Sequence, residues 1–110
     1  MRNTLKPGST NTVEVLKVRD DDAGIAATGA NASAVGELLD ATRTALAPAV
    51  TLTPGYVSGT AGTWRASVAS TVALVDKTTY YARLTITFTS GPNAGVVRRF
   101  DILCYADADD

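Results

Sequence analysis

The sequence predicts an all-β fold, a sandwich of six to seven short antiparallel strands over residues 12–106 that follows an N-terminal arm. Three observations lead to this prediction. The 110 residues include sixteen threonines and eleven valines, which favour pleated backbone over helix. Apolar and polar residues alternate along residues 80–88, as in a strand with one buried face. Short segments rich in Gly, Pro, Asn and Asp separate the apolar stretches, as turns do.

The first half of the chain is predicted to form strands joined by turns. Residues 12–18 form a strand whose apolar positions change parity midway, which indicates a β-bulge. Residues 20–24 begin with three aspartates and form a turn. Residues 30–39 form a strand of mostly small side chains, and residues 40–44 turn the chain into a further strand at 45–53.

The middle of the chain is predicted to hold two turns, at residues 53–56 and 58–62, because both segments contain glycine. Residues 63–68 form a strand whose even-numbered side chains face inward. Residues 70–75 are expected to make one helical turn, with Ser70 as its N-cap.

Residues 80–88 and 96–105 predict a final hairpin, with even-numbered side chains inward on both strands and the loop at residues 90–95. Inward residues must face inward residues, so opposed residue numbers have an even sum. A loop of five residues then places Ile86 opposite Phe100. The other predicted pairs are Leu84 with Ile102, Ala82 with Cys104, Tyr81 with Tyr105 and Arg83 with Leu103.

The two ends of the chain lie outside the predicted sandwich. Residues 1–11 are mostly polar, and Pro7 and Gly8 oppose regular pairing, so we expect an arm that is ordered by contacts with a neighbouring molecule. Leu5 and Pro7 are its candidate contact residues. Residues 107–110 carry three aspartates and are predicted to form an acidic tail.

Composition excludes several classes of site. The chain has no histidine and one cysteine, Cys104, which excludes a Ser-His-Asp or Cys-His nucleophile, a Cys/His zinc site and an intrachain disulfide. Ten Lys and Arg against eleven Asp and Glu give a net charge of −1, without the concentrated basic face that nucleic acid requires. No apolar stretch approaches the roughly 20 residues of a membrane span. We therefore expect neither nucleic acid nor a membrane as a partner.

The acidic residues do not form a recognisable site. The aspartates within residues 20–24 lack the spacing and the downstream glutamate of an EF-hand, so a solvated turn is expected. Glu37, Asp40 and Asp101 offer the carboxylates that glycoside hydrolysis needs, but no cleft pattern accompanies them. We expect no catalytic residue, no metal and no cofactor.

The outer face of the final hairpin is the remaining candidate for a functional surface. It gathers Tyr81, Arg83, Arg99, Leu103 and Tyr105. Tyrosine and arginine are enriched at protein interfaces because they combine a large contact area with directional polar groups. These five residues are the candidate interface, and an ordinary outer sheet face with scattered apolar residues is the alternative.

Residues 74–82, with the sequence LVDKTTYYA, resemble the tyrosine corner of immunoglobulin-like (Ig-like) sandwiches. Residues 38–44 and 62–68 are similar to strands of Ig-like modules that are common in virion proteins of tailed bacteriophages. The resemblance implies an Ig-like sandwich in which Tyr80 is buried and its hydroxyl bonds to the backbone of residues 74–77. It brings no catalytic residue with it.

The resemblance also implies a function. Residues 1–11 lack the apolar region of a secretory signal, so we expect folding in the host bacterial cytoplasm and a place in the virion. The implied role is a non-enzymatic capsid decoration or cement protein, or a head–tail or tail accessory, present in multiple copies against the major capsid or tail protein. The alternative is a carbohydrate- or receptor-binding Ig-like module of a larger secreted or surface protein. Tyr56 beside Gly55 is the only hint of that alternative.

Overall fold

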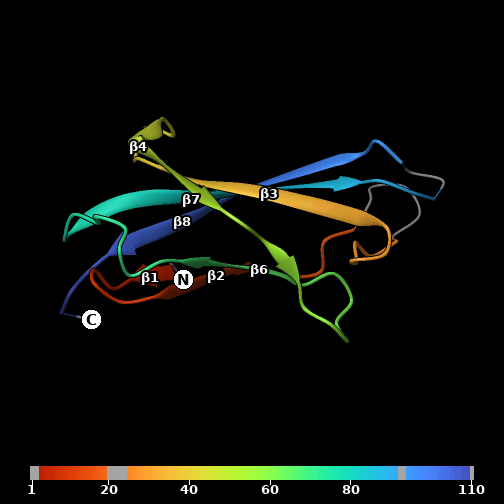
Figure 1. Cartoon of the computed structure of the whole chain (residues 1–110), viewed down its shortest axis with the longest axis horizontal. Helices are drawn as coiled ribbons and strands as arrows, with labels where there is room; N and C mark the ends of the chain where they lie inside the picture. Colours follow the sequence, from red (N-terminus) through yellow and green to blue (C-terminus); the bar gives the residue numbers. More distant parts are fainter. Residues whose placement is uncertain (1–2, 20–24, 92–93, 110) are drawn as a thin grey trace.

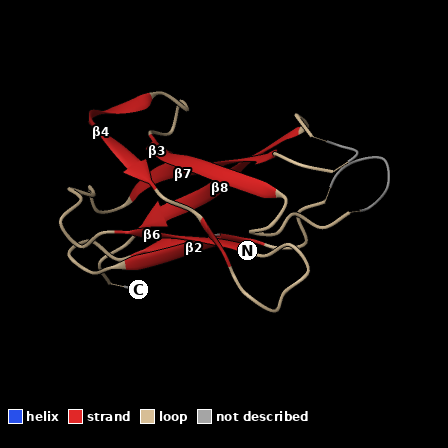
Figure 2. Ribbon diagram, turned by 45° about the vertical axis from the view of Figure 1, so that its right-hand side comes forward, coloured by secondary structure: helices blue, strands red, loops and turns tan. Residues whose placement is uncertain are grey.

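The chain folds into two β-sheets packed face to face. A computed structural model describes residues 3–19, 25–91 and 94–109. Its strands are β1 (Asn3–Leu5), β2 (Asn11–Val15), β3 (Ala32–Leu39), β4 (Ala45–Leu52), β5 (Gly55–Tyr56), β6 (Trp64–Val68), β7 (Thr78–Phe88) and β8 (Val97–Ala106). One sheet has the order β1-β8-β7-β3-β4 and the other the order β2-β6-β5 (Figure 1). The described residues contain strands and loops (Figure 2), so the predicted all-β architecture with two sheets is confirmed.

The core lies between the sheets because each strand turns its apolar side chains toward the other layer. β7 contributes Leu84, Ile86 and Phe88, all at most 1% exposed. Trp64 and Val68 of β6 meet them from the opposite sheet. The remaining fully buried hydrophobic residues are Leu5, Val13, Val18, Ala27, Leu38, Leu39, Ala82, Cys104 and Ala106. The predicted inward positions of β6 and β7 are thereby confirmed.

The register of the final hairpin differs from the prediction by two residues. Ile86 pairs with Arg98, and Phe100 pairs with Leu84. The parity argument holds, since even-numbered residues still face even-numbered residues, but the predicted pairs are wrong. The loop is longer than expected because the Phe88 amide donates to the Val96 carbonyl and leaves residues 89–95 outside the ladder.

Glycines explain how the longer loop closes. Gly91 and Gly95 both have positive φ, at 83° and 95°, which residues with a Cβ adopt at a cost. The Gly95 amide also donates to the Phe88 carbonyl at 2.7 Å. The loop therefore closes on Phe88 and Val96, and the ladder begins beyond them.

The first predicted strand is shorter than expected. β2 ends at Val15, and Lys17 adopts a φ of 55°. This reversal leaves Leu16 exposed and turns Val18 into the core, where its amide donates to the Gly62 carbonyl at 2.9 Å. The change of parity therefore reflects the end of the strand and not the predicted bulge within it. The predicted turn at residues 20–24 lies outside the described residues.

β4 links the two sheets. Its ladder with β3 jumps from Val50, opposite Leu38, to Ala45, opposite Leu39, so residues 46–49 have no partner in that ladder. Beyond Leu52 the chain passes into the opposite sheet as β5 (Figure 1). The segment predicted as a turn at residues 53–56 is thus a crossing between sheets that ends in a short strand.

The N-terminal segment is part of the sandwich, which corrects the expectation that strands begin near residue 12 and are all antiparallel. β1 runs parallel to β8, with Leu5 opposite Ala106. Leu5 is fully buried in the core, and its carbonyl accepts a hydrogen bond from the Asp107 amide. The Asn11 side chain then closes the turn into β2, accepting from the Lys6 amide at 2.8 Å. The buried Leu5, the ladder with β8 and the Asn11 cap together hold this polar segment on the sandwich.

The described part of the predicted acidic tail contacts the sandwich. The Lys77 ammonium lies 2.6 Å from a carboxylate oxygen of Asp107 and 3.5 Å from one of Asp109. The Ala108 amide donates to the Asp76 carboxylate at 2.8 Å. Residues 107–109 therefore lie against the turn that precedes β7.

The segment between β6 and β7 contains no helical turn, so the predicted N-cap at Ser70 is wrong. The Val72 amide instead bonds to the Ala69 carbonyl in a tighter reversal. The predicted corner bond is confirmed, because the Tyr80 hydroxyl accepts from the Val75 amide at 2.9 Å. Tyr80 itself is buried.

Tyr80→Phe should lower the free energy of unfolding by about 1–3 kcal/mol, because it leaves the part-buried Val75 amide unpaired. Chemical denaturation of the two proteins measures the difference. Tyr81→Phe is the matched control, since Tyr81 lies on the other face of β7 and its hydroxyl makes no such bond. Equal losses from both substitutions would contradict the role of the corner.

Candidate interaction face and open polar pocket

The predicted interface residues of the hairpin lie on one face of the five-stranded sheet. Tyr81 pairs with Leu103, Thr85 with Arg99 and Thr79 with Tyr105. Directly paired residues of antiparallel strands project to the same side, so these side chains share the face that points away from the core. The structure thus brings together Tyr81, Arg83, Arg99, Leu103 and Tyr105.

Two exposed valines extend this face. Val35 of β3 and Val97 of β8 occupy the same outward rows as Thr85 and Thr87 and are 67% and 52% exposed. With Leu103, they make up three of the five exposed large aliphatic residues among those the structure describes. We call the surface formed by Val35, Arg43, Tyr81, Arg83, Val97, Arg99, Asp101, Leu103 and Tyr105 the outer face.

An ionic network holds the centre of the outer face. Arg83 binds Asp101 in a two-pronged arrangement, with Nε–Oδ1 at 2.8 Å and Nη2–Oδ2 at 3.0 Å. Arg43 approaches the same carboxylate, with Nε 3.2 Å from Oδ2. The hydrogen bond from Arg83 is the main reason that the pKa of Asp101 lies below its usual value. Asp101 therefore stays ionised and keeps both guanidinium groups in fixed positions.

Arg43 reaches this network from a turn between β3 and β4. Its φ of 62° lies in the left-handed region, which disfavours side chains with a Cβ. Asp40 stabilises the turn by accepting hydrogen bonds from the Thr42 and Thr44 amides at 2.8 and 3.0 Å. The guanidinium carbon of Arg43 lies 4.4 Å from the centre of the Tyr81 ring, in cation–π geometry. A strained backbone thus presents Arg43 to the outer face.

The sequence did not single out Arg43, Val35 or Val97 as candidate interface residues. A turn residue gives no sign in the sequence that it folds back over a distant strand. The two valines follow the odd-numbered outward pattern that identified the other members, so that signal was present for them.

The two candidate residues of the arm lie elsewhere. Leu5 fills the core and has no exposed surface, so its side chain cannot reach a partner while β1 is docked. Pro7 is half-buried in the turn that follows β1. Neither residue belongs to the outer face.

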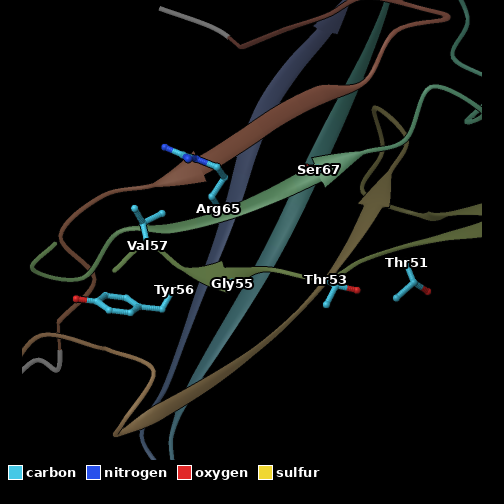
Figure 3. Close-up of a pocket in the computed structure, with 7 residues that line it drawn as sticks. All are labelled: Thr51, Thr53, Gly55, Tyr56, Val57, Arg65 and Ser67. Carbon is cyan, nitrogen blue, oxygen red and sulfur yellow. The ribbon is translucent and has the colours of Figure 1, made fainter. Parts of the chain in front are cut away.

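A second candidate site is an open pocket of about 510 Å³ at the end of β4. Figure 3 shows its lining residues, which come from the end of β4, from β5 and from β6. They are Thr51, Thr53, Gly55, Tyr56, Val57, Arg65 and Ser67. Most of them carry hydroxyl or guanidinium groups, so the pocket is polar and open to water.

Tyr56 lies at this pocket but is held in place by the protein. Its ring centre is 5.8 Å from that of Trp64, at an interplanar angle of 57°. Its hydroxyl donates to the Thr60 carbonyl. The ring is half-buried, so it forms a rigid wall of the pocket and not a freely exposed stacking platform.

Cys104 is a buried residue of the core. Burial raises the pKa of its thiol to about 11, so the reactive thiolate is scarce at neutral pH. Within the described ranges, no three Cys, Asp or Glu residues gather in a metal-binding arrangement. Across those same ranges, no helix is long and apolar enough to cross a membrane.

Comparisons of the chain with protein families, with curated proteins and with solved structures gave no match.

Proposed function

We propose that the chain is a non-enzymatic structural protein of a tailed-bacteriophage virion, a capsid decoration or cement protein or a head–tail or tail accessory. The observation that carries the proposal is the outer face, where exposed aliphatic residues surround an ionic network that is already assembled. Such a surface offers apolar area together with directional polar groups, as protein interfaces do. The resemblance of residues 38–44 and 62–68 to Ig-like modules of tailed-bacteriophage virion proteins supports the virion assignment.

The proposed mechanism is mechanical. Each copy presents the outer face to the major capsid or tail protein, or to another copy of itself. Arg43 and Arg83 are held in place before contact, so little side-chain freedom is lost when a partner binds. Individual contacts are weak, and many copies on one particle make the attachment strong. The chain folds in the host cytoplasm and joins the particle during assembly.

Co-expression with the products of the flanking genes tests this function. Particles purified on a density gradient should contain the chain in many copies. The double variant Tyr81→Ala, Leu103→Ala should remain folded by circular dichroism and be lost from the particles, because it removes apolar contact area from the outer face. A folded wild-type chain that never sediments with particles would overturn the proposal.

Arg43→Gly should separate binding from stability. Glycine relieves the left-handed strain, which offsets the loss of an exposed ion pair worth about 0–1 kcal/mol, so the melting temperature should change little. Incorporation into particles should fall, because the guanidinium group is gone from the outer face. Lys17→Gly is the matched control, since Lys17 has a similar φ of 55° but lies outside that face. Equal incorporation of the two variants into particles would show that Arg43 does not contribute to the interface.

A carbohydrate- or receptor-binding module is the second candidate function. The specific observation in its favour is the open polar pocket beside Gly55 and Tyr56, which is lined by Thr51, Thr53 and Ser67. Its volume of about 510 Å³ falls within the roughly 300–1,000 Å³ typical of ligand sites. Such a module would bind its ligand where the end of β4 meets β5 and β6.

A further inference from the structure

We propose that the edge of the sandwich at β4 holds an extended segment of another protein. The segment adds a strand along residues 46–49 and places an aliphatic side chain in an apolar groove of about 230 Å³. Four residues of β4 line this groove, together with Val72, Ala73 and Val75 of the connection to β7 and with Tyr80. The groove shares no residue with the outer face or with the open polar pocket, so it is a separate surface that goes beyond both proposed functions.

The backbone of residues 46–49 is available to a further strand. These residues belong to β4 but have no partner in its ladder with β3. β4 is also the last strand of the five-stranded sheet, so no strand lies along its other side (Figure 1). Backbone groups without a strand partner at a sheet edge are a template for an added strand. Pro48 lacks an N–H group, so Leu46, Ala47 and Ala49 supply the amides that can donate.

The groove beside this backbone is apolar and continues the core. None of its eight lining residues is charged, and their one polar side-chain group, the Tyr80 hydroxyl, already accepts from the Val75 amide. Leu46, Val50 and Val72 are half-buried and pack against the core, whereas Val75 is 63% exposed. An aliphatic side chain that enters the groove would therefore cover Val75 and extend the core.

The size and the lining of the groove specify what can enter it. Its volume lies below the roughly 300–1,000 Å³ typical of small-molecule sites, which favours a peptide side chain over a free ligand. A charged group would lose its hydration there without gaining a partner. The site therefore calls for an extended backbone that carries an aliphatic side chain such as leucine.

The described residues of a second copy do not present such a segment. Their exposed large aliphatic residues number five. Val35, Val97 and Leu103 lie on β3 and β8, strands that are paired on both sides. Leu16 lies just beyond the end of β2, where the chain reverses, and Val75 lines the groove itself. The occupant is therefore a segment of a different protein.

The test follows the amide signals of the isotope-labelled full chain by NMR during titration with a peptide. The probe is a capped heptapeptide of threonines with leucine at its centre, because threonine favours extended backbone. We expect a saturable shift of the Leu46, Ala47 and Ala49 amide signals and slower hydrogen exchange at these amides. The same peptide with aspartate at its centre should bind at least about tenfold more weakly. A leucine peptide with methylated backbone nitrogens should also lose binding, because it cannot donate to the β4 carbonyls.

Val75→Asp should weaken binding of the leucine peptide at least about tenfold, because it places a carboxylate in the groove. The Val75 side chain is exposed, so the melting temperature should change little. Val35→Asp is the matched control, since Val35 is equally exposed but lies on the outer face, away from the groove. Its affinity for the peptide should stay within about twofold of the wild type.

The outcomes separate the parts of the proposal. Absence of a shift at residues 46–49 would overturn it entirely. Equal affinity for the leucine and aspartate peptides would overturn the apolar groove, and equal losses from the two valine substitutions would overturn its location. Undiminished binding of the methylated peptide would overturn the added strand. Self-association of the chain in sedimentation equilibrium, abolished by Val75→Asp, would show that a second copy is the occupant. None of these results bears on the outer face.

Discussion

Gly62→Ala should lower the free energy of unfolding by about 2–6 kcal/mol, since backbone strain and overpacking each cost about 1–3 kcal/mol. Gly62 has a φ of +99°, and an added Cβ would stand 2.5 Å from the Val18 carbonyl oxygen and 2.7 Å from its nitrogen. Those are backbone atoms, which cannot rotate away. Val18 is also fixed on both sides, because its amide donates to the Gly62 carbonyl and its carbonyl accepts from the Ala27 amide.

Gly59→Ala is the control that separates the close approach from the backbone conformation. Gly59 has a φ of +83°, but nothing lies within 4 Å of its added Cβ. This substitution should lower the free energy of unfolding by only about 1–2 kcal/mol, the cost of placing a side chain in the left-handed region. Urea denaturation of both variants gives the two values. If the two losses were equal, the contact between Gly62 and Val18 would contribute nothing of its own.

Leu5→Ala should lower the free energy of unfolding by about 2–5 kcal/mol, the range for a fully buried leucine that leaves a cavity. A domain of this size is stable by about 5–15 kcal/mol, so the loss is a large fraction of the total. Deleting residues 1–10 should cost at least as much, because the β1–β8 ladder is lost together with Leu5. Denaturant titration of each variant measures both effects.

Thr4→Ala is the control within the same strand, because the Thr4 side chain is exposed. Its effect should stay within about 0.5 kcal/mol. A deletion of residues 1–10 that left stability unchanged would restore the expectation drawn from the sequence, namely an arm ordered by a neighbour. It would also show that Leu5 contributes nothing to the core.

The strands with the longest alternating patterns were predictable from the sequence. β7 alternates strictly from Thr79 to Phe88, and its even-numbered residues are buried from Tyr80 to Phe88. The pattern of β6 is shorter but equally regular, with Trp64 at its start. Alternation fixes which side of a strand is buried, so it also fixed the parity of the hairpin. It does not fix the length of a loop, and the pairing shifted by two residues where Gly91 and Gly95 extended the turn.

Other elements had no signal of their own. β1 has three residues and one apolar side chain, Leu5, which is too little for a period to be recognised. Its docking requires a space for Leu5 between the sheets, and that space exists only once the rest of the chain has folded. The same holds for Arg43, whose position over Tyr81 depends on a turn conformation that side chains normally avoid. The hydroxyl residues of the pocket belong to no motif and meet only because β4 crosses into the other sheet.

The parallel pairing of β1 with β8 has a mechanical consequence. The chain enters this ladder at Asn3 and leaves it at Ala106, and the two strands run side by side in the same direction. Tension on the two ends therefore pulls the strands in opposite directions along their common axis. The hydrogen bonds between them are loaded together in shear, whereas a hairpin pulled open from one end would lose its bonds one at a time. Leu5 has to leave the core before this ladder can part, so the domain resists stretching at the point where force would enter it.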